Sequence, residues 1–219
     1  SVPMYNGKMV TSAQGNTYIP NPNSFNVTKI TSDGAVSTID TTPAIYASTY
    51  GFSIVVDSDE NLYTTYLSAP SQFSAQKMTP AGVKTFLGYI GNTPYDVQLD
   101  EAGNVYTLNI NSTTVSKITP SGITTSLGPT VSYDWSFAVD KSGNSYVSDN
   151  STNQIVKSYP NGDTINFATA ENGPNSTVVD TYGNIYTANK VANTVSKITP
   201  DGTVSTFATT LPNGPQKLL

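Results

Sequence analysis

Short stretches in which apolar and polar residues alternate recur along the whole chain, with turn residues about every eight to twelve positions. Residues 185–188 (IYTA) and 194–199 (TVSKIT) alternate as half-buried strands do. Residues 176–180 (STVVD) and 203–208 (TVSTFA) are further β-type runs. A tight turn is expected at Pro200-Asp201-Gly202, because proline presets φ and glycine accepts a positive φ. The pattern predicts four short strands per unit and no helix.

This unit repeats with a period of forty residues. Residues 99–126, 139–166 and 179–206 align without gaps, and the glycines of their two turns are spaced by forty: Gly103, Gly143 and Gly183, then Gly122, Gly162 and Gly202. The two upstream copies differ more from the repeat: VDSDENLYTTY begins at Val56, and QGNTYIP begins at Gln14. Four strands in each of five copies predict an all-β fold, a β-propeller of about five four-stranded blades, complete or as part of a six-bladed ring.

We expect one propeller domain over residues 1–219. Its repeats are predicted at about 7–40, 50–87, 93–127, 133–168 and 173–208, with a partial sixth repeat at 211–219. All-β domains of this length occur as one unit.

The repeat carries a recognisable motif: two apolar residues and Asp, two further residues, Gly-Asn-apolar-Tyr, and then Lys-Ile-Thr-Pro-x-Gly. This motif resembles NHL repeats and the closely related streptogramin-lyase-like (virginiamycin B lyase-like) repeats over almost the whole chain. The resemblance implies a β-propeller. It does not fix an activity, because this architecture is used by lyases, lactonases, lectins and scaffolds.

The residues that enzymes of such families need are largely missing. Virginiamycin-type lyases depend on histidine with an acidic residue and Mg²⁺, whereas this chain has no histidine, cysteine or arginine. Gluconolactonase-type propellers hold a divalent metal with Glu, Asn and Asp. Here Glu60 and Glu101 fall in a turn predicted to lie at the surface, and Glu171 alone is placed to face a central opening. We therefore predict no catalytic residue, no metal and no cofactor; the alternative is a metal-dependent lyase or lactonase.

Three residue types recur at fixed positions of the repeat. Aspartate is expected to cap its own turn, where Ser12 stands in the first copy, rather than to bind Ca²⁺. Lysine is expected on a solvated strand face, and tyrosine in the packing between blades. These ladders are Asp57, Asp100, Asp140 and Asp180; Lys29, Lys77, Lys117, Lys157 and Lys197; and Tyr18, Tyr63, Tyr106, Tyr146 and Tyr186.

The candidate ligand-binding residues occupy one position, five residues before the repeated aspartate. They are Phe52, Tyr95, Trp135 and Asn175. Aromatic residues on loops over a rigid scaffold suit stacking against sugar rings or a partner. The alternative is that they pack on one another and plug the channel entrance.

The end of the sequence starts the repeat again. Residues 211–219 (LPNGPQKLL) match residues 171–179 (ENGPNSTVV), although residues 8–11 already supply a first strand for the first copy. Three explanations stay open: a fragment of a longer propeller, a strand that closes the ring on the first blade, or a strand that pairs with a neighbouring copy. The candidate assembly strand is Pro215, Gln216, Lys217, Leu218 and Leu219.

The composition of the chain indicates where the protein is located and what it binds. The chain is rich in Ser, Thr, Asn and Tyr, has a net charge of −5, and has no apolar stretch long enough to span a membrane. We expect a secreted or cell-surface protein that does not bind nucleic acid, with Asn-X-Ser/Thr glycosylation candidates at Asn26, Asn111, Asn150 and Asn175. The predicted function is a non-enzymatic structural, self-assembly or adhesion module that contacts other proteins or its own copies, including as a head-to-tail oligomer or filament. The alternative is a lectin-like propeller that binds glycans.

Overall fold

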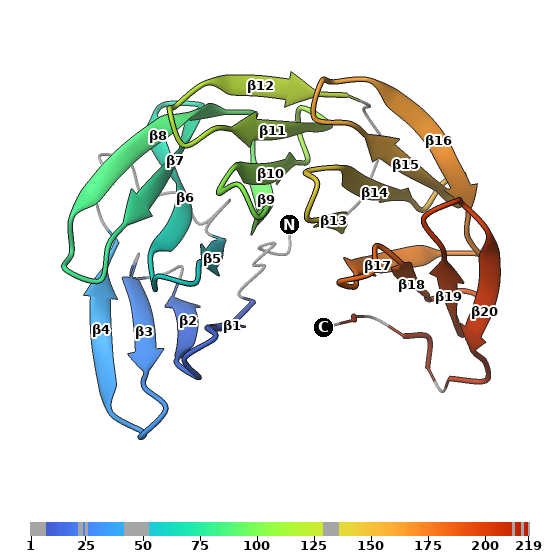
Figure 1. The fold of residues 1–219 in the computed structure, drawn as a ribbon, viewed down its shortest axis with the longest axis horizontal. Coiled ribbons are helices and arrows are strands. Elements are labelled where there is room, and N and C mark those ends of the chain that lie inside the picture. Colours follow the sequence, from blue (N-terminus) through green and yellow to red (C-terminus); the bar gives the residue numbers. More distant parts are fainter. Residues whose placement is uncertain are drawn as a thin grey trace. The chain divides into compact units, whose positions relative to one another are not determined.

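The computed structural model describes residues 8–21, 24, 26–41, 53–128, 136–211, 213–215 and 217–218. Within these residues all regular secondary structure is β-strand, and the strands form five four-stranded antiparallel sheets (Figure 1). Consecutive strands pair in every sheet, so that each sheet is an antiparallel meander. In this part of the chain no helix has the length and hydropathy of a membrane span.

Each sheet corresponds to one repeat and is called a blade below. Blade one contains β1 (Val10–Thr11), β2 (Thr17–Asn21), β3 (Asn26–Ile30) and β4 (Val36–Asp40). Blade two contains β5 (Ile54–Val56), β6 (Leu62–Ala69), β7 (Gln72–Met78) and β8 (Lys84–Ile90). Blade three contains β9 (Pro94–Leu99), β10 (Val105–Asn109), β11 (Thr114–Ile118) and β12 (Thr124–Leu127). Blade four contains β13 (Phe137–Val139), β14 (Ser145–Asp149), β15 (Gln154–Ser158) and β16 (Thr164–Thr169). Blade five contains β17 (Pro174–Val179), β18 (Ile185–Asn189), β19 (Thr194–Ile198) and β20 (Val204–Ala208).

The turn between the first and second strands is held by the repeated aspartate. In blade five, Asp180 Oδ1 accepts hydrogen bonds from the backbone N–H groups of Tyr182 and Asn184, both at 2.9 Å. Gly183 adopts a φ of 81°, which is favourable only without a side chain. The same bonds form at Asp57 and Asp140. The prediction that these aspartates cap their own turns is confirmed, and Ser12 accepts the matching bond from the Asn16 N–H at 3.3 Å.

Blades one and two, blades two and three, and blades four and five pack on each other through two apolar faces. The acceptor face of a blade carries one residue from each of its second, third and fourth strands, and the donor face of the next blade carries residues from its first three strands. Acceptor and donor residues share buried clusters: Tyr18, Val27 and Ile39 with Val56, Leu62 and Met78; Tyr63, Ala75 and Leu87 with Leu99, Val105 and Ile118; Tyr146, Ile155 and Phe167 with Val179, Ile185 and Ile198. The expected role of the tyrosines in packing between blades is therefore confirmed in these clusters.

A β-bulge directs one residue toward the acceptor face. In blade four, Val156 pairs with Asn166 and Ile155 with Ala168, which leaves Phe167 as the extra residue of β16. Leu87 in blade two and Phe207 in blade five are extra residues in the same way. A bulge turns its extra residue away from the regular alternation of the strand.

The chain divides into two compact units. The first comprises Ser1–Leu99, Gly103–Ser112 and Ser116–Thr125, and it contains blades one and two and most of blade three. The second comprises Asp100–Ala102, Thr113–Val115 and Ser126–Leu219, and it contains blades four and five.

Candidate functional site

The aspartate, tyrosine and lysine ladders form one repeated arrangement inside the blades. In blade four, the Tyr146 hydroxyl donates to Asp140 Oδ2 at 3.0 Å. Lys157 pairs with Tyr146 in the sheet, and its Nζ lies 5.3 Å from the centre of that ring. The matching lysine-to-ring distances in the other blades are 5.2 Å (Lys29), 5.4 Å (Lys77), 5.8 Å (Lys117) and 5.8 Å (Lys197).

The lysines therefore do not form the solvated face that the sequence suggested. All five lie on third strands, which are paired on both edges, and all are only partly exposed. Each ammonium group lies against an aromatic ring, where it gains a cation–π attraction. The lysine ladder thus joins the second and third strands within each blade.

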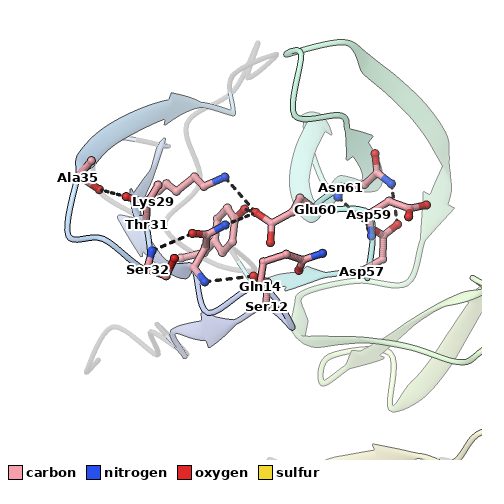
Figure 2. A network of polar contacts seen from close by, with 12 residues as sticks. Ser12, Gln14, Lys29, Thr31, Ser32, Ala35, Asp57, Asp59, Glu60 and Asn61 are labelled. Atoms are coloured by element: carbon pink, nitrogen blue, oxygen red, sulfur yellow. Dashed lines mark hydrogen bonds and ion pairs between the residues drawn. The ribbon is translucent and has the colours of Figure 1, made fainter.

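Blade one lacks the repeated carboxylate, and Glu60 of blade two supplies it (Figure 2). Glu60 Oε2 accepts hydrogen bonds from Asn16 Nδ2 at 2.8 Å and from the Tyr18 hydroxyl, and it pairs with Lys29 Nζ at 3.0 Å. The asparagine and the tyrosine are the donors that the repeated aspartate has at Asp57, Asp140 and Asp180. The lysine contact corresponds to that of Lys77 with Asp57, at 4.0 Å. The expectation that Glu60 lies at the surface is wrong, since its side chain is only 13% exposed.

The Glu60 carboxylate is held in its ionised form. Burial raises the pKa of Glu60, but the hydrogen bonds and Lys29 together lower it to about 2. Glu60 adopts a φ of 64° at the position where the four other copies have glycine. This conformation costs a residue with a side chain about 1 kcal/mol, which the contacts across the blade boundary must offset. A second contact, from Gln14 Nε2 to the Ser58 carbonyl at 2.6 Å, reinforces the same boundary.

Asp96 is a buried carboxyl group that the sequence reasoning missed. It lies on β9, only 7% exposed, and its Oδ1 accepts hydrogen bonds from Ser53 Oγ at 3.2 Å and from the Val97 N–H at 2.9 Å. Burial raises the pKa of Asp96. The sequence contains a departure from the repeat that could have identified it. Asp96 stands four residues before Asp100, where three other copies have serine: Ser53, Ser136 and Ser176.

The predicted ligand-binding residues are only partly within the described structure. Tyr95 on β9 and Asn175 on β17 are both half-buried. Phe52 and Trp135 lie outside the described residues. The lectin-like site therefore stays a prediction.

Glu171 does not face a central opening. Its Oε2 accepts a hydrogen bond from Thr194 Oγ1 at 2.6 Å, and its Oε1 accepts one from Thr206 Oγ1. These threonines belong to β19 and β20, the third and fourth strands of blade five, so the carboxylate is directed along the blade away from the β17 edge. Within the described ranges no group of three or more His, Cys, Asp or Glu residues could hold a metal ion.

The glycosylation candidates differ in their surroundings. Asn150 is exposed in the turn after β14. Asn111 is also exposed, but its Nδ2 donates to Thr93 Oγ1 at 2.7 Å. Asn26 and Asn175 lie half-buried on strands. Glycosylation stays a prediction at all four positions.

The segment after β20 follows blade five as β17 follows blade four. The Leu218 N–H donates to Ser176 Oγ at 3.0 Å, and forty-one residues earlier the Thr177 N–H donates to Ser136 Oγ at 2.7 Å. The Leu211 N–H binds the Asn193 carbonyl, as the Ala170 N–H binds that of Asn153. Gln216 and Leu219 of the candidate assembly strand lie outside the described residues.

The fourth strands of the blades expose large apolar side chains. Phe86 and Tyr89 of β8 are 52% and 55% exposed and form an edge-to-face pair with ring centres 5.2 Å apart. The bulge at Leu87 brings these two side chains to the same side of the strand. Other exposed apolar residues on fourth strands are Val36, Ile165, Val204 and Phe207.

Comparisons with known proteins identify the fold. No family model and no curated protein matches the sequence. Among solved structures, virginiamycin B lyase from Staphylococcus aureus superposes with a TM-score of 0.76 at 17% identity, over 95% of this chain and 72% of that one. A streptogramin B lyase gives 0.77 at 14% identity, over 99% and 74% of the two chains. The chain is a β-propeller.

This result confirms the predicted fold class and the predicted likeness to streptogramin-lyase-like propellers. The calcium-binding protein regucalcin from Agrobacterium tumefaciens is also similar, with a TM-score of 0.64 at 18% identity, over 99% of this chain and 78% of that one. At such identities the likeness shows the fold alone. Because the similar propellers include lyases, the comparisons do not support the expectation that this chain is not an enzyme.

Proposed function

We propose that this propeller is a non-enzymatic module that works by association with proteins, its own copies included, at the cell surface or outside the cell. The observation that carries the proposal is the exposure of large apolar side chains on the fourth strands, above all the Phe86–Tyr89 pair. Exposed apolar patches on a folded domain commonly mark interaction surfaces.

The repeated polar groups favour the same conclusion. The carboxylates of Asp57, Asp140, Asp180 and Glu60 already bind backbone N–H groups or side chains of the blades. Lysine ammonium groups lie over tyrosine rings. Each fourth strand, in contrast, pairs on one edge only within its sheet and presents the other edge for strand addition or apolar contact.

Sedimentation velocity of the purified protein over a wide concentration range tests this proposal. We expect the mass to rise with concentration, and the double variant Phe86→Ser/Tyr89→Ser to weaken binding wherever that pair takes part. Tyr182→Ser is the matched control, because Tyr182 is 84% exposed but lies in a turn between first and second strands. A wild-type protein that stays monomeric throughout and binds no other protein would contradict the proposal.

A catalytic role is the second candidate, favoured by the fold that the chain shares with the two lyases. Asp96 is the group best suited to it, because a carboxyl whose pKa is raised by burial can hold a proton nearer neutral pH. Quinupristin, which is bound in a structure of an inactive virginiamycin B lyase, is the direct test substrate. Its conversion by the wild type, lost in Asp96→Asn, would establish catalysis. Quinupristin that stays intact after long incubation would contradict this candidate.

A further inference from the structure

One member of the lysine ladder is enclosed by aromatic rings. Lys157 Nζ lies 4.8 Å from the centre of the Tyr159 ring. The centres of the Tyr146 and Phe167 rings are each 5.3 Å away. In the described part of the chain, each of the other four ladder lysines lies over a single ring. The three rings and the lysine all belong to blade four, and together they form an aromatic cage around the ammonium group.

Tyr159 completes the cage, and it is a departure from the repeat. The regular residue at this position stabilises its own turn, as Thr119 does when its Oγ1 accepts a hydrogen bond from the Ile123 N–H at 3.1 Å. Tyr159 cannot make this bond and contributes an aromatic ring instead. The four other copies have threonine here: Thr31, Thr79, Thr119 and Thr199.

The caged ammonium group has aromatic neighbours and no polar partner. Among the residues that the structure describes, Lys157 Nζ makes no hydrogen bond and no ion pair. Lys29 differs, because its Nζ pairs with Glu60 of the next blade at 3.0 Å. Blade five has Gly183 at the position of Glu60 and therefore offers no carboxylate there. An unmodified ammonium group has three N–H donors that need acceptors, whereas each added methyl group removes one of them.

We propose that Lys157 is a site of N-methylation and that the three rings bind the methylated side chain. Methylation keeps the positive charge of lysine. It also makes the cation larger and more apolar, and aromatic cages recognise cations of this kind. Lys157 is partly exposed, so its side chain is not closed off from solvent. This inference goes beyond the proposed function and does not depend on association with proteins.

The modification requires a methyl donor, for which a sulfonium compound has the right chemistry. The ammonium group first loses a proton to solvent, and the Nζ lone pair then attacks the methyl carbon of the donor. A C–N bond forms while the C–S bond breaks, and sulfur leaves with the electron pair as a neutral thioether. Nitrogen becomes positively charged again, so the net charge of the side chain is the same before and after each transfer.

Mass spectrometry of peptides from the protein isolated from the organism that makes it tests the proposal directly. We expect the peptide that contains Lys157 to carry the added mass of one to three methyl groups. Lys197 is the matched control, because it occupies the same position of blade five and lies over the Tyr186 ring alone, at 5.8 Å. Unmodified Lys157 in the isolated protein, or equal methylation of both lysines, would overturn the inference.

Reductive methylation of the recombinant protein tests whether the cage favours the methylated side chain. Formaldehyde with a borane reductant dimethylates lysine amines but leaves a guanidinium group unchanged. The shift in Tm on methylation should be about 2–4 °C more favourable in the wild type than in Lys157→Arg. Tyr159→Thr, which restores the regular residue, should lose most of this difference, while Lys197→Arg should keep it. Circular dichroism checks that each variant folds. An identical shift in the wild type and Lys157→Arg would contradict the proposed role of the cage, and the proposed function would be unaffected.

Discussion

At the scale of single residues, Glu60 occupies a turn position that is glycine in the other copies, and its side chain stabilises the neighbouring blade. Its carboxylate binds Asn16, Tyr18 and Lys29 of blade one, where Ser12 cannot supply a charge. The cost is a positive φ of 64° for a residue with a side chain. The two departures from the repeat, Ser12 and Glu60, therefore compensate each other.

Glu60→Gln should lower the free energy of unfolding by about 1–3 kcal/mol, because a charged acceptor of three hydrogen bonds becomes a neutral one. The double variant Ser12→Asp/Glu60→Gly restores the regular repeat, with the carboxylate in blade one and a glycine at the positive φ. We expect it to regain most of the loss in urea denaturation. Glu101→Gln, whose side chain is 64% exposed, should change little. A double variant no more stable than Glu60→Gln would show that the two positions are not coupled.

The same residue predicts a pH dependence. The pKa of Glu60 is about 2 in the folded chain against an ordinary value of 4.5. Because the folded-state pKa is the lower one, the ionised carboxylate contributes its full stability above about pH 4.5 and loses it as the pH falls toward 2. The wild type should thus lose its advantage over Glu60→Gln across this window, as measured by denaturation at each pH. Comparing the two proteins separates Glu60 from Asp96, whose raised pKa acts in the opposite direction. A constant difference between them down to pH 2 would disprove the assignment.

At the scale of elements, the strands could be read from the sequence because turn glycines and alternating residues recur together. The run 194–199 became β19 (Thr194–Ile198), and the run 176–180 falls largely within β17 (Pro174–Val179). The β-bulges could not be predicted from the sequence, because one extra residue does not visibly change the alternation of apolar and polar residues in so short a strand. The contact of Glu60 with Tyr18 could not be predicted either, because it joins residues forty-two positions apart in different copies of the repeat. The aspartate, tyrosine and lysine ladders could be recognised in the sequence, but the contacts among them depend on the register between strands.

Hydrogen exchange should follow the position of each strand in its blade. All five residues of β10 and of β14 are buried, and each strand is paired on both sides. The fourth strands β4 and β20 are mostly exposed and have a free edge within their sheets. We therefore expect the amides of β10 and β14 to exchange slowest and those of β4 and β20 markedly faster, because edge strands open with less loss of buried surface. Equal protection across all four strands of a blade in a monomeric sample would contradict this gradient.

At the scale of the whole molecule, fold and function have different sources of evidence. The fold follows from features present in every copy, and solved propellers of less than 20% identity share it. Function, by contrast, depends on what differs between copies. Ser12, Glu60 and Asp96 are such departures, because they change where the chain places a carboxylate relative to the regular copies.

Ionic strength should then control association in a defined direction. Each copy carries a net charge of −5, so copies repel one another at low salt, while the Phe86–Tyr89 pair that we propose to take part in association is apolar. Added salt screens the repulsion and leaves the apolar contact intact, because the Debye length falls to about 8 Å at physiological ionic strength. Sedimentation velocity at fixed protein concentration should therefore show larger assemblies as NaCl rises from low to physiological levels, and the double variant Phe86→Ser/Tyr89→Ser should show a smaller increase. Assemblies that dissociate on adding salt would instead indicate contacts made by ion pairs, and would exclude the Phe86–Tyr89 pair as the main contact.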